Sequence, residues 1–546
     1  MKYRSKHLDH HGIVAAACRE IGIAEEIDKA ISPDPRQKLT TGEAIMAMII
    51  NGLGFTSRPL SLTPQFFQSK PVELLIKPGI IADEINDDVL GRALDTIYEF
   101  GCTTLFSRIA MRAVKKFSVD IKYQHLDTTV MQVEGEYGNQ IEITPWSGDK
   151  GQSLISFGRP KDGDQSHKQF LISMLTSNDG GIPILYEALS GNTSDQKHFK
   201  QVLKKLRKEI QESNEDIYHI ADSALYCEPN IVDLADSDIK FITHVPGKIK
   251  ETEKLKLAID KSVMKDFGNG YYGYEICSIY GKVAQRWLLI ESEKAFHREY
   301  QILQKVIRKE MIGLPKALKK IRAQAFACEK DAFKAVQKEI SKSDFHILNA
   351  YTINTKAKKE GKGRVKKDEV LEQEYFISAS VKLSKSKLRT AKRIKGRFIL
   401  ATNELDSEKL STADILSYYK DQQMVERGFR FLKDPVCMAD AVFLKKTTRI
   451  VALGMVMCLC LLVYSIAQRH LRKALVANKE TLPNQIQKQT QTPTMRWIFQ
   501  IFEGIDVLYE EINTQVRIIV LNLDDLQRNI LALLGFPYQQ IYLLAT

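Results

Sequence analysis

Residues 121–135 read IKYQHLDTTVMQVEG, an apolar stretch with strand-like alternation that carries Asp127 near its centre. Four further strand patterns follow along the chain, at residues 170–178, 182–190, 216–224 and 240–246. An Asn-Asp-Gly-Gly sequence separates the first two of these patterns and predicts a tight hairpin between them. Three consecutive strands followed by alternating helices and strands predict an α/β fold, with helices on the faces of a mixed sheet.

The chain is long enough for several domains, and its composition is that of a globular protein. Of its 546 residues, 44% are hydrophobic and 27% are charged, which excludes a disordered chain, a collagen-like fibre and a small disulfide scaffold. The insertion that we expect in the middle of the chain reads as a β ribbon, a helical stretch broken at Gly313 and Pro315, and a basic segment. We expect five regions: a helical N-terminal domain (1–115), the first part of the α/β core (116–247), the insertion (248–397), the second part of the core (398–475) and a C-terminal helical region (476–546).

Positive charge is concentrated in one part of the insertion. The chain carries 79 Lys and Arg against 67 Asp and Glu, a net charge of +12. Residues 354–397 alone hold 15 Lys or Arg against 5 Asp or Glu, a net of +10. Two interpretations remain open, a solvated lysine-rich loop or a surface that faces a polyanion. For the second interpretation the candidate contacts are Lys358, Lys359, Lys366 and Lys367.

One segment has the composition of a membrane span. Residues 450–468 carry no charge over 19 positions, which is long enough to cross a bilayer as a helix. A helix that is apolar on all faces is also found at the centre of large soluble proteins, and we favour this buried-core interpretation over a membrane anchor. The N-terminal segment lacks an apolar signal region, and the eight cysteines include no C-x-x-C pair, so we expect reduced thiols in a cytosol-like compartment.

Three acidic residues stand out by their context. Asp127 interrupts an apolar strand, Asp222 follows the apolar run IYHIA, and Glu426 lies in the helical stretch SYYKDQQMVERGFRFLKDP. A carboxylate in a buried strand is costly unless it is compensated, and a bound divalent cation compensates it strongly. Strand ends that face a crevice are also where open α/β sheets bind ligands. Each acid alone is more typical of a cap or turn residue, so the inference depends on the three together.

The helix around Glu426 strengthens this interpretation. Tyr419, Glu426 and Lys433 are spaced by seven residues, so they share one face of a helix, with two turns between neighbours. Cationic and aromatic side chains crowd the same segment, as is expected where phosphates approach a metal. The alternative is a surface helix with ion pairs one turn apart, such as Glu426 with Arg430.

The spacing Tyr419-x2-Gln422-x3-Glu426-x6-Lys433 resembles the Y-x2-R-x3-E-x6-K signature of bacterial insertion-sequence transposases of the DDE type, the insertion-sequence-four group and its relatives. Four other sequence segments match that family as well, namely FGRPKDGDQSHKQF, LSGNTSD, HIADSALY and VERGFRFLKDP. The resemblance covers most of residues 85–470 and implies an RNase H-like core with a β-rich insertion. Gln422 stands where the family has an arginine thought to touch DNA phosphate. Whether this chain makes that contact at the end of the DNA strand is therefore left open.

The resemblance implies a DNA transposase that exposes a 3′-OH at each transposon end and joins it to target DNA. It implies that Asp127, Asp222 and Glu426 are the catalytic residues and hold two Mg²⁺ ions, with Mn²⁺ as a substitute. The implied DNA contacts are Tyr419, Gln422, Arg427 and Lys433. The implied partners are double-stranded DNA and a second copy of the chain, in the bacterial cytoplasm and without a membrane, and residues 1–115 are expected to bind the DNA ends.

Two other functions remain open, a catalytically inactive DNA-binding protein derived from a transposase and a nuclease that cuts without joining. Two further residues have alternative roles. Trp287 is either a stacking partner for an unpaired base or, as we favour, an aromatic packed on a strand. His125 points to the same strand face as Asp127, and we expect it to be structural.

Overall fold

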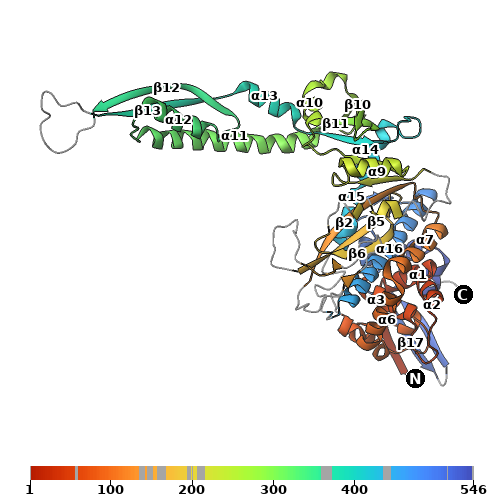
Figure 1. The fold of residues 1–546 in the computed structure, drawn as a ribbon. Helices are drawn as coiled ribbons and strands as arrows, with labels where there is room; N and C mark the ends of the chain where they lie inside the picture. Colours follow the sequence, from red (N-terminus) through yellow and green to blue (C-terminus); the bar gives the residue numbers. More distant parts are fainter. Residues whose placement is uncertain are drawn as a thin grey trace, which may run out of the picture.

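The computed structural model consists of a body of helices and sheet, which carries both termini, and a long arm that projects from it (Figure 1). The residues that the structure describes are 2–55, 60–133, 142–143, 152–156, 168–193, 198–199, 201–205, 216–357, 372–433, 444, 446–512 and 515–543. The candidate polyanion contacts lie outside these described residues, namely Lys358, Lys359, Lys366 and Lys367.

A mixed sheet of nine strands, counted over the described residues, forms the centre of the molecule. Its order is β6 (Pro183–Ser190), β5 (Lys168–Ser177), β2 (Tyr123–Val133), β7 (Tyr218–Ala221), β8 (Lys240–His244), β14 (Arg397–Thr402), β11 (Val283–Ser292), β10 (Tyr271–Tyr280) and β9 (Lys265–Gly268). The strands β6, β5 and β2 pair antiparallel, β2, β7 and β8 pair parallel, and the remaining pairs are antiparallel. The predicted α/β fold with a mixed sheet is confirmed.

The hairpin between β5 and β6 shows why the sequence folds in this way. Nearly every side chain of these two strands is buried, because apolar clusters cover both faces of the sheet. Gly180 and Gly181 in the connecting turn have φ angles of 93° and 67°, a left-handed conformation that glycine adopts without a Cβ clash. The predicted hairpin is confirmed.

The ribbon of the insertion is continuous with the core sheet. Strand β14 pairs antiparallel with β8 on one side and with β11 on the other, so β10 and β11 extend the sheet that contains β2 and β7. The sequence analysis did not predict this continuity, because the pairing joins strands that are distant along the chain.

The arm is the distal part of the insertion (Figure 1). It consists of α11 (Glu293–Arg322), α12 (Glu329–Ile340), β12 (His346–Ala357) and β13 (Gln373–Leu383), and α13 (Lys385–Ile394) leads back to β14. Its apolar cluster is small and separate from those of the body. The buried members of this cluster are Leu318, Ala332, Val336 and Ile377.

The expected break at Gly313 and Pro315 is wrong, because α11 is continuous through both residues. Pro315 lacks an N–H and so removes one helical hydrogen bond. Leu314 and Leu318, on either side of it, are buried, and this tertiary packing holds the helix together where its intrinsic propensity is weak.

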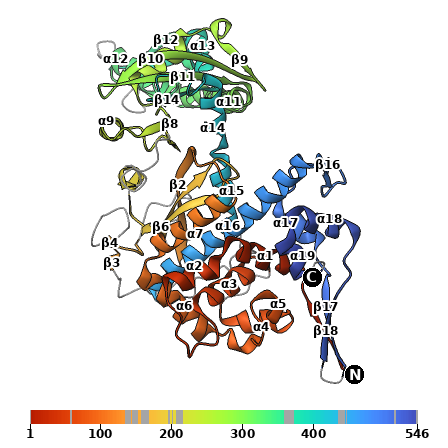
Figure 2. The same cartoon turned by 90° about the vertical axis from the view of Figure 1, so that its right-hand side faces the viewer.

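Helix α16 (Thr447–Ala477) runs through the body (Figure 2). It packs against α3 (Thr41–Gly52), α6 (Asp87–Phe100) and α7 (Cys102–Lys116). By length and composition it is apolar enough to cross a membrane, but 94% of its most apolar window is buried inside the protein. The buried-core interpretation of residues 450–468 is confirmed.

The two ends of the chain meet in a second, smaller sheet. Strand β1 (Lys2–His7) pairs with β17 (Asp506–Ile512), which also pairs with β18 (Gln515–Leu521). Helix α1 (His11–Ile21) packs on α19 (Phe536–Ile541), so the N-terminal helices and the C-terminal region share one apolar cluster. The C-terminal region therefore contains strands as well as the expected helices.

Candidate active site

Asp127 lies on β2, and Asp222 directly follows the neighbouring parallel strand β7. His125 of β2 pairs with Ile220 of β7. Two residues further along each strand, the same register brings Asp127 beside Asp222 on one face of the sheet. Both side chains are half-buried. The sequence analysis identified the two acids separately, and the fold brings them together.

Backbone hydrogen bonds hold both aspartates in place. The N–H of Thr128 donates to Oδ1 of Asp127 over 2.8 Å. The N–H of Ala224 donates to Oδ1 of Asp222 over 2.8 Å, in the turn that ends β7. The hydroxyl of Thr243, on β8, donates to the backbone carbonyl of Asp222 over 2.8 Å and so ties the end of β7 to its neighbour.

The segment that we expected to form one helix forms two consecutive helices, with Gln422 between them. Helix α14 (Thr412–Asp421) carries Tyr419, and α15 (Gln423–Leu432) carries Glu426. Gln422 keeps right-handed helical backbone angles, φ −52° and ψ −25°, but its N–H donates to the carbonyl of Tyr419, three residues back instead of four. Lys433 lies just beyond the end of α15. The predicted helix is therefore interrupted at one residue and continues on both sides of it.

Both helices pack on the sheet face that carries the aspartates, and α15 lies beside β2 (Figure 2). On α14, the ring of Tyr418 stacks on Tyr123 at the start of β2, with ring centroids 3.6 Å apart. Helix α15 buries one apolar stripe and leaves its charged residues on the opposite side. The residues of this stripe are Val425, Gly428, Phe429 and Leu432.

Gly428 brings the helix of Glu426 close to the strand pair at Asp127. A Cβ at this glycine would lie 4.0 Å from the terminal methyl carbon of Met174 and 3.0 Å from a methyl carbon of Leu461. Met174 is the residue of β5 that pairs directly with Asp127. The absence of a side chain therefore lets α15 rest against the sheet at the level of the first aspartate.

Glu426 has two kinds of neighbour. Its side chain is 57% exposed and lies 3.7 Å from Arg430, the ion pair that the alternative interpretation predicts. It also influences Tyr419: burial and then the negative charges of Asp222 and Glu426 raise the pKa of Tyr419 to about 12. Two of the three acids therefore act on one hydroxyl group.

The three carboxylates do not form a closed metal site in this conformation. Within the part of the chain that the structure describes, no group of three or more His, Cys, Asp or Glu side chains is arranged to hold a metal ion. The chemistry of the donors nevertheless suits Mg²⁺ or Mn²⁺, because these hard cations prefer carboxylate oxygen to sulfur or nitrogen.

The candidate DNA contacts differ in their surroundings. Tyr419 is half-buried, and its ring lies 6.5 Å from that of His244 and 6.4 Å from that of Phe398. Gln422, between α14 and α15, is half-buried, whereas Arg427 and Lys433 are exposed.

Trp287 and His125 have the structural surroundings that we favoured. Trp287 is 2% exposed, and its indole N–H donates to the hydroxyl of Tyr226 over 3.1 Å. A ring held in this way is not presented to an unpaired base. Nε2 of His125 lies 2.8 Å from Oδ1 of Asn178 in the β5–β6 turn, and burial lowers the pKa of His125.

The sequence indicated the basic segment 354–397 but did not single out the cationic helix α13 within it. Residues 385–397 read KSKLRTAKRIKGR and hold seven Lys or Arg and no Asp or Glu. Within the basic segment, the absence of Asp and Glu distinguishes α13 from the preceding residues, in which acids and cations are mixed.

Two family models match the chain. Residues 3–111 match a model described as a domain of unknown function (DUF4277). No curated protein matches the chain. Residues 126–463, more than half of the chain, match the model described as Transposase DDE domain, and this segment includes Asp127, Asp222 and Glu426. The chain therefore belongs to the Transposase DDE domain family.

Proposed function

We propose that the chain is an insertion-sequence transposase of the group with the Y-R-E-K signature and that its core is RNase H-like. In this proposal it cleaves double-stranded DNA at transposon ends and transfers the 3′-OH to target DNA, as a homodimer in the cytoplasm. The observation that supports it most is the parallel register of β2 and β7, which extends to Asp127 on β2 and to Asp222 directly after β7. The order β6-β5-β2-β7-β8, three antiparallel strands followed by two parallel ones, supports the RNase H-like core.

The proposed roles follow from how each acid is held. Asp127 lies on β2 and Asp222 in the turn directly after β7, and a backbone N–H holds one oxygen of each, so both carboxylates are positioned before DNA arrives. Glu426 is on the exposed surface of α15, and it completes the group by turning from Arg430 toward the strands. Two Mg²⁺ ions, or Mn²⁺ in their place, would supply the charge that activates the attacking oxygen and stabilises the leaving 3′ oxygen.

Tyr419 and its neighbours are proposed to position the phosphate. Because the pKa of Tyr419 is raised to about 12, its hydroxyl stays protonated and donates a hydrogen bond to an anionic phosphate oxygen. Arg427 and Lys433 are exposed and carry charges that neutralise neighbouring phosphates. Gln422 offers a hydrogen bond without a charge.

A cleavage assay tests this proposal, with duplex DNA from the region that abuts the reading frame, and with Mg²⁺. We expect Asp127→Asn, Asp222→Asn and Glu426→Gln each to lower strand cleavage by roughly 10³-fold or more, because each removes a group that acts in the chemical step. DNA binding should change little, because the exposed cations remain.

Asp236→Asn is the matched control, since Asp236 is an exposed carboxylate at the end of α9 (Glu228–Asp236). Full cleavage by one of the three variants removes that residue from the active site. DNA binding by the wild type without any metal-dependent cleavage would identify an inactive DNA-binding protein. Cleavage without joined products would identify a nuclease.

A further inference from the structure

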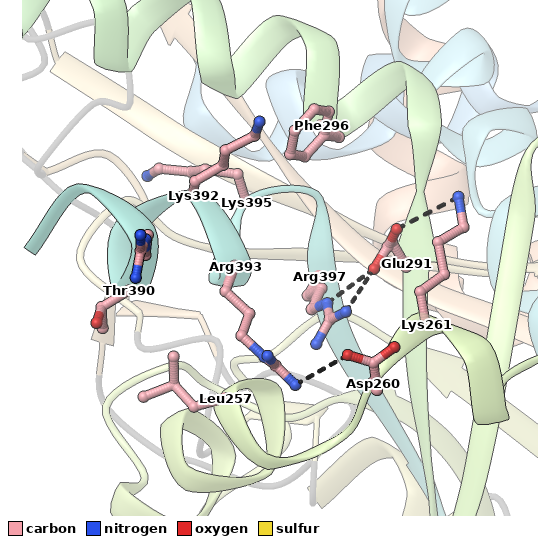
Figure 3. A pocket seen from close by; sticks show the side chains of 11 residues that line it. Leu257, Asp260, Lys261, Glu291, Phe296, Thr390, Lys392, Arg393, Lys395 and Arg397 are labelled. Carbon is pink, nitrogen blue, oxygen red and sulfur yellow. Dashed lines mark hydrogen bonds and ion pairs between the residues drawn. The ribbon is translucent and has the colours of Figure 1, made fainter. Parts of the chain in front are cut away.

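A cavity of about 690 Å³ lies where the arm joins the sheet (Figure 3). It opens to the surface and is lined by the segment after α10 (Lys250–Ala258), by the junction of β11 and α11, and by α13 with the start of β14. Of its 11 lining residues, two are acids and six are cations. The cations are Lys261, Arg389, Lys392, Arg393, Lys395 and Arg397.

Both acids of the cavity already have cationic partners, as Figure 3 shows. Glu291 accepts a hydrogen bond from Arg397 over 2.7 Å and lies 3.5 Å from Lys261. Asp260 lies 3.4 Å from Arg393. The two carboxylates therefore neutralise the cations on one side of the cavity only.

The remaining cations carry a surplus of positive charge. No carboxylate of the described residues forms an ion pair with Arg389, Lys392 or Lys395. Lys392 lies 5.2 Å from the ring centre of Tyr300, a contact that leaves its charge in place. Such a cluster suits a ligand with several phosphate charges, because the free energy of bringing like cations together is recovered when anions bind.

The cavity is at the same edge of the sheet as the aspartates. Ala221 of β7 is level with Thr243 of β8, which pairs with Ala401 of β14. One residue further, Asp222 is level with His244 of β8, which pairs with Leu400 of β14. Arg397 precedes Leu400 by three residues on β14, and β14 is two strands away from β7. Strand geometry makes this separation about 14 Å.

We propose that this cavity binds the phosphodiester backbone of DNA, about four nucleotides from the cleaved bond by the spacing of phosphates along one strand. The proposal rests on the proposed function, because it places the DNA relative to Asp127 and Asp222. Arg397 reaches the carbonyl of Lys256 on the α10 side of the sheet, whereas the aspartates face α14. A DNA duplex that lies along this edge of the sheet would contact the cavity on one face and the aspartates on the other.

The salt dependence of DNA binding tests the proposal. We expect the triple variant Arg389→Gln/Lys392→Gln/Lys395→Gln, with a short blunt duplex as probe, to make the slope of log affinity against log salt shallower by roughly two to three, at about 0.9 per phosphate contact. These side chains make no described ion pair with an acid, so the variant should melt at the wild-type temperature. Lys392→Arg/Lys395→Arg keeps the charge and should keep the slope.

The matched control is Lys479→Gln/Lys488→Gln/Arg528→Gln, which removes three exposed cations of the body outside residues 1–115. Equal slopes for the two triple variants overturn the proposal. Calorimetry with tripolyphosphate is a second test. If the triple variant at Arg389, Lys392 and Lys395 no longer binds tripolyphosphate but keeps the wild-type salt slope for DNA, the cavity binds a small polyphosphate, and the proposed DNA contact is overturned. Nicking of a supercoiled plasmid by the wild type with Mg²⁺ is scored separately, so failure of the transposase proposal is distinguished from failure of this one.

Discussion

The sheet around Asp127 and the arm differ in the burial of the elements that carry their charged residues. In the sheet, β5 and β6 are buried along nearly their whole length, and the acids take positions fixed by strand register. In the arm, most of β12 is exposed, and the cations of α13 stand on the surface. The two regions therefore differ in how they support charge: a buried sheet holds the acids near Asp127, whereas an exposed and slender arm carries the cations of α13.

The largest expected effect comes from a buried charge of the body. Arg469 of α16 is buried, forms an ion pair with Asp179 in the β5–β6 turn, and donates to the carbonyls of Phe117 and Ser118 over 2.9 Å each. We expect Arg469→Met to lower the free energy of unfolding by about 4 kcal/mol, because these groups lose their main partner. Urea denaturation measures it. Arg430→Met, on the exposed side of α15, should change the same quantity by about 0.5 kcal/mol or less.

The second prediction tests whether the arm has its own core. Leu318→Ala removes a large side chain from the arm cluster, at an expected cost of about 3 kcal/mol. Hydrogen exchange should become faster in α11, α12 and β13 and stay unchanged in α16. Ile312→Ala, at a residue of α11 that is 57% exposed, is the control. Equal loss of protection in α16 would show that arm and body unfold as one unit.

The smallest expected effect is a pH-dependent contribution in the body. Arg449 of α16 donates to both oxygens of Asp95 on α6, over 2.8 and 2.6 Å, and these bonds hold the pKa of Asp95 below its usual value. A carboxyl group with a lowered folded pKa stabilises the protein above its unfolded pKa, and this stabilisation is lost as the pH falls through the folded value.

We therefore expect Asp95→Asn to cost at most about 1 kcal/mol at neutral pH, since the pair is partly exposed. The difference from the wild type should shrink below about pH 4, which denaturation at a series of pH values measures. Glu99→Gln, an exposed acid on the same helix, should show neither effect. A difference that persists in acid would show that Asp95 acts by packing and not by charge.

The parts of the fold that were predictable from the sequence depend on local pattern. The strands β2, β5 and β6 follow from alternation, apolar runs and the glycine turn, which are properties of neighbouring residues. The position of Asp222 at a strand end follows in the same way. That Asp127 and Asp222 lie beside each other does not follow, because it depends on the register between two strands that are far apart in sequence.

The incorrect predictions also concern features that depend on contacts between segments distant in the sequence. Helix α11 continues through Pro315 because Leu314 and Leu318 are buried against other elements, and propensity alone predicts a break. The joining of β14 to β8 likewise depends on pairing between segments that are distant in the sequence. The cationic helix α13 was visible as an acid-free run, but the cavity beside it also needs Lys261 from another segment.

The chain leaves the sheet through β11 and returns through β14, its direct neighbour. The arm is therefore attached to the body through the hydrogen bonds between β11 and β14. On its other side β14 pairs with β8, and Thr243 of β8 holds the end of β7 through the carbonyl of Asp222. A continuous path of backbone and side-chain hydrogen bonds thus connects the base of the arm to the backbone at Asp222.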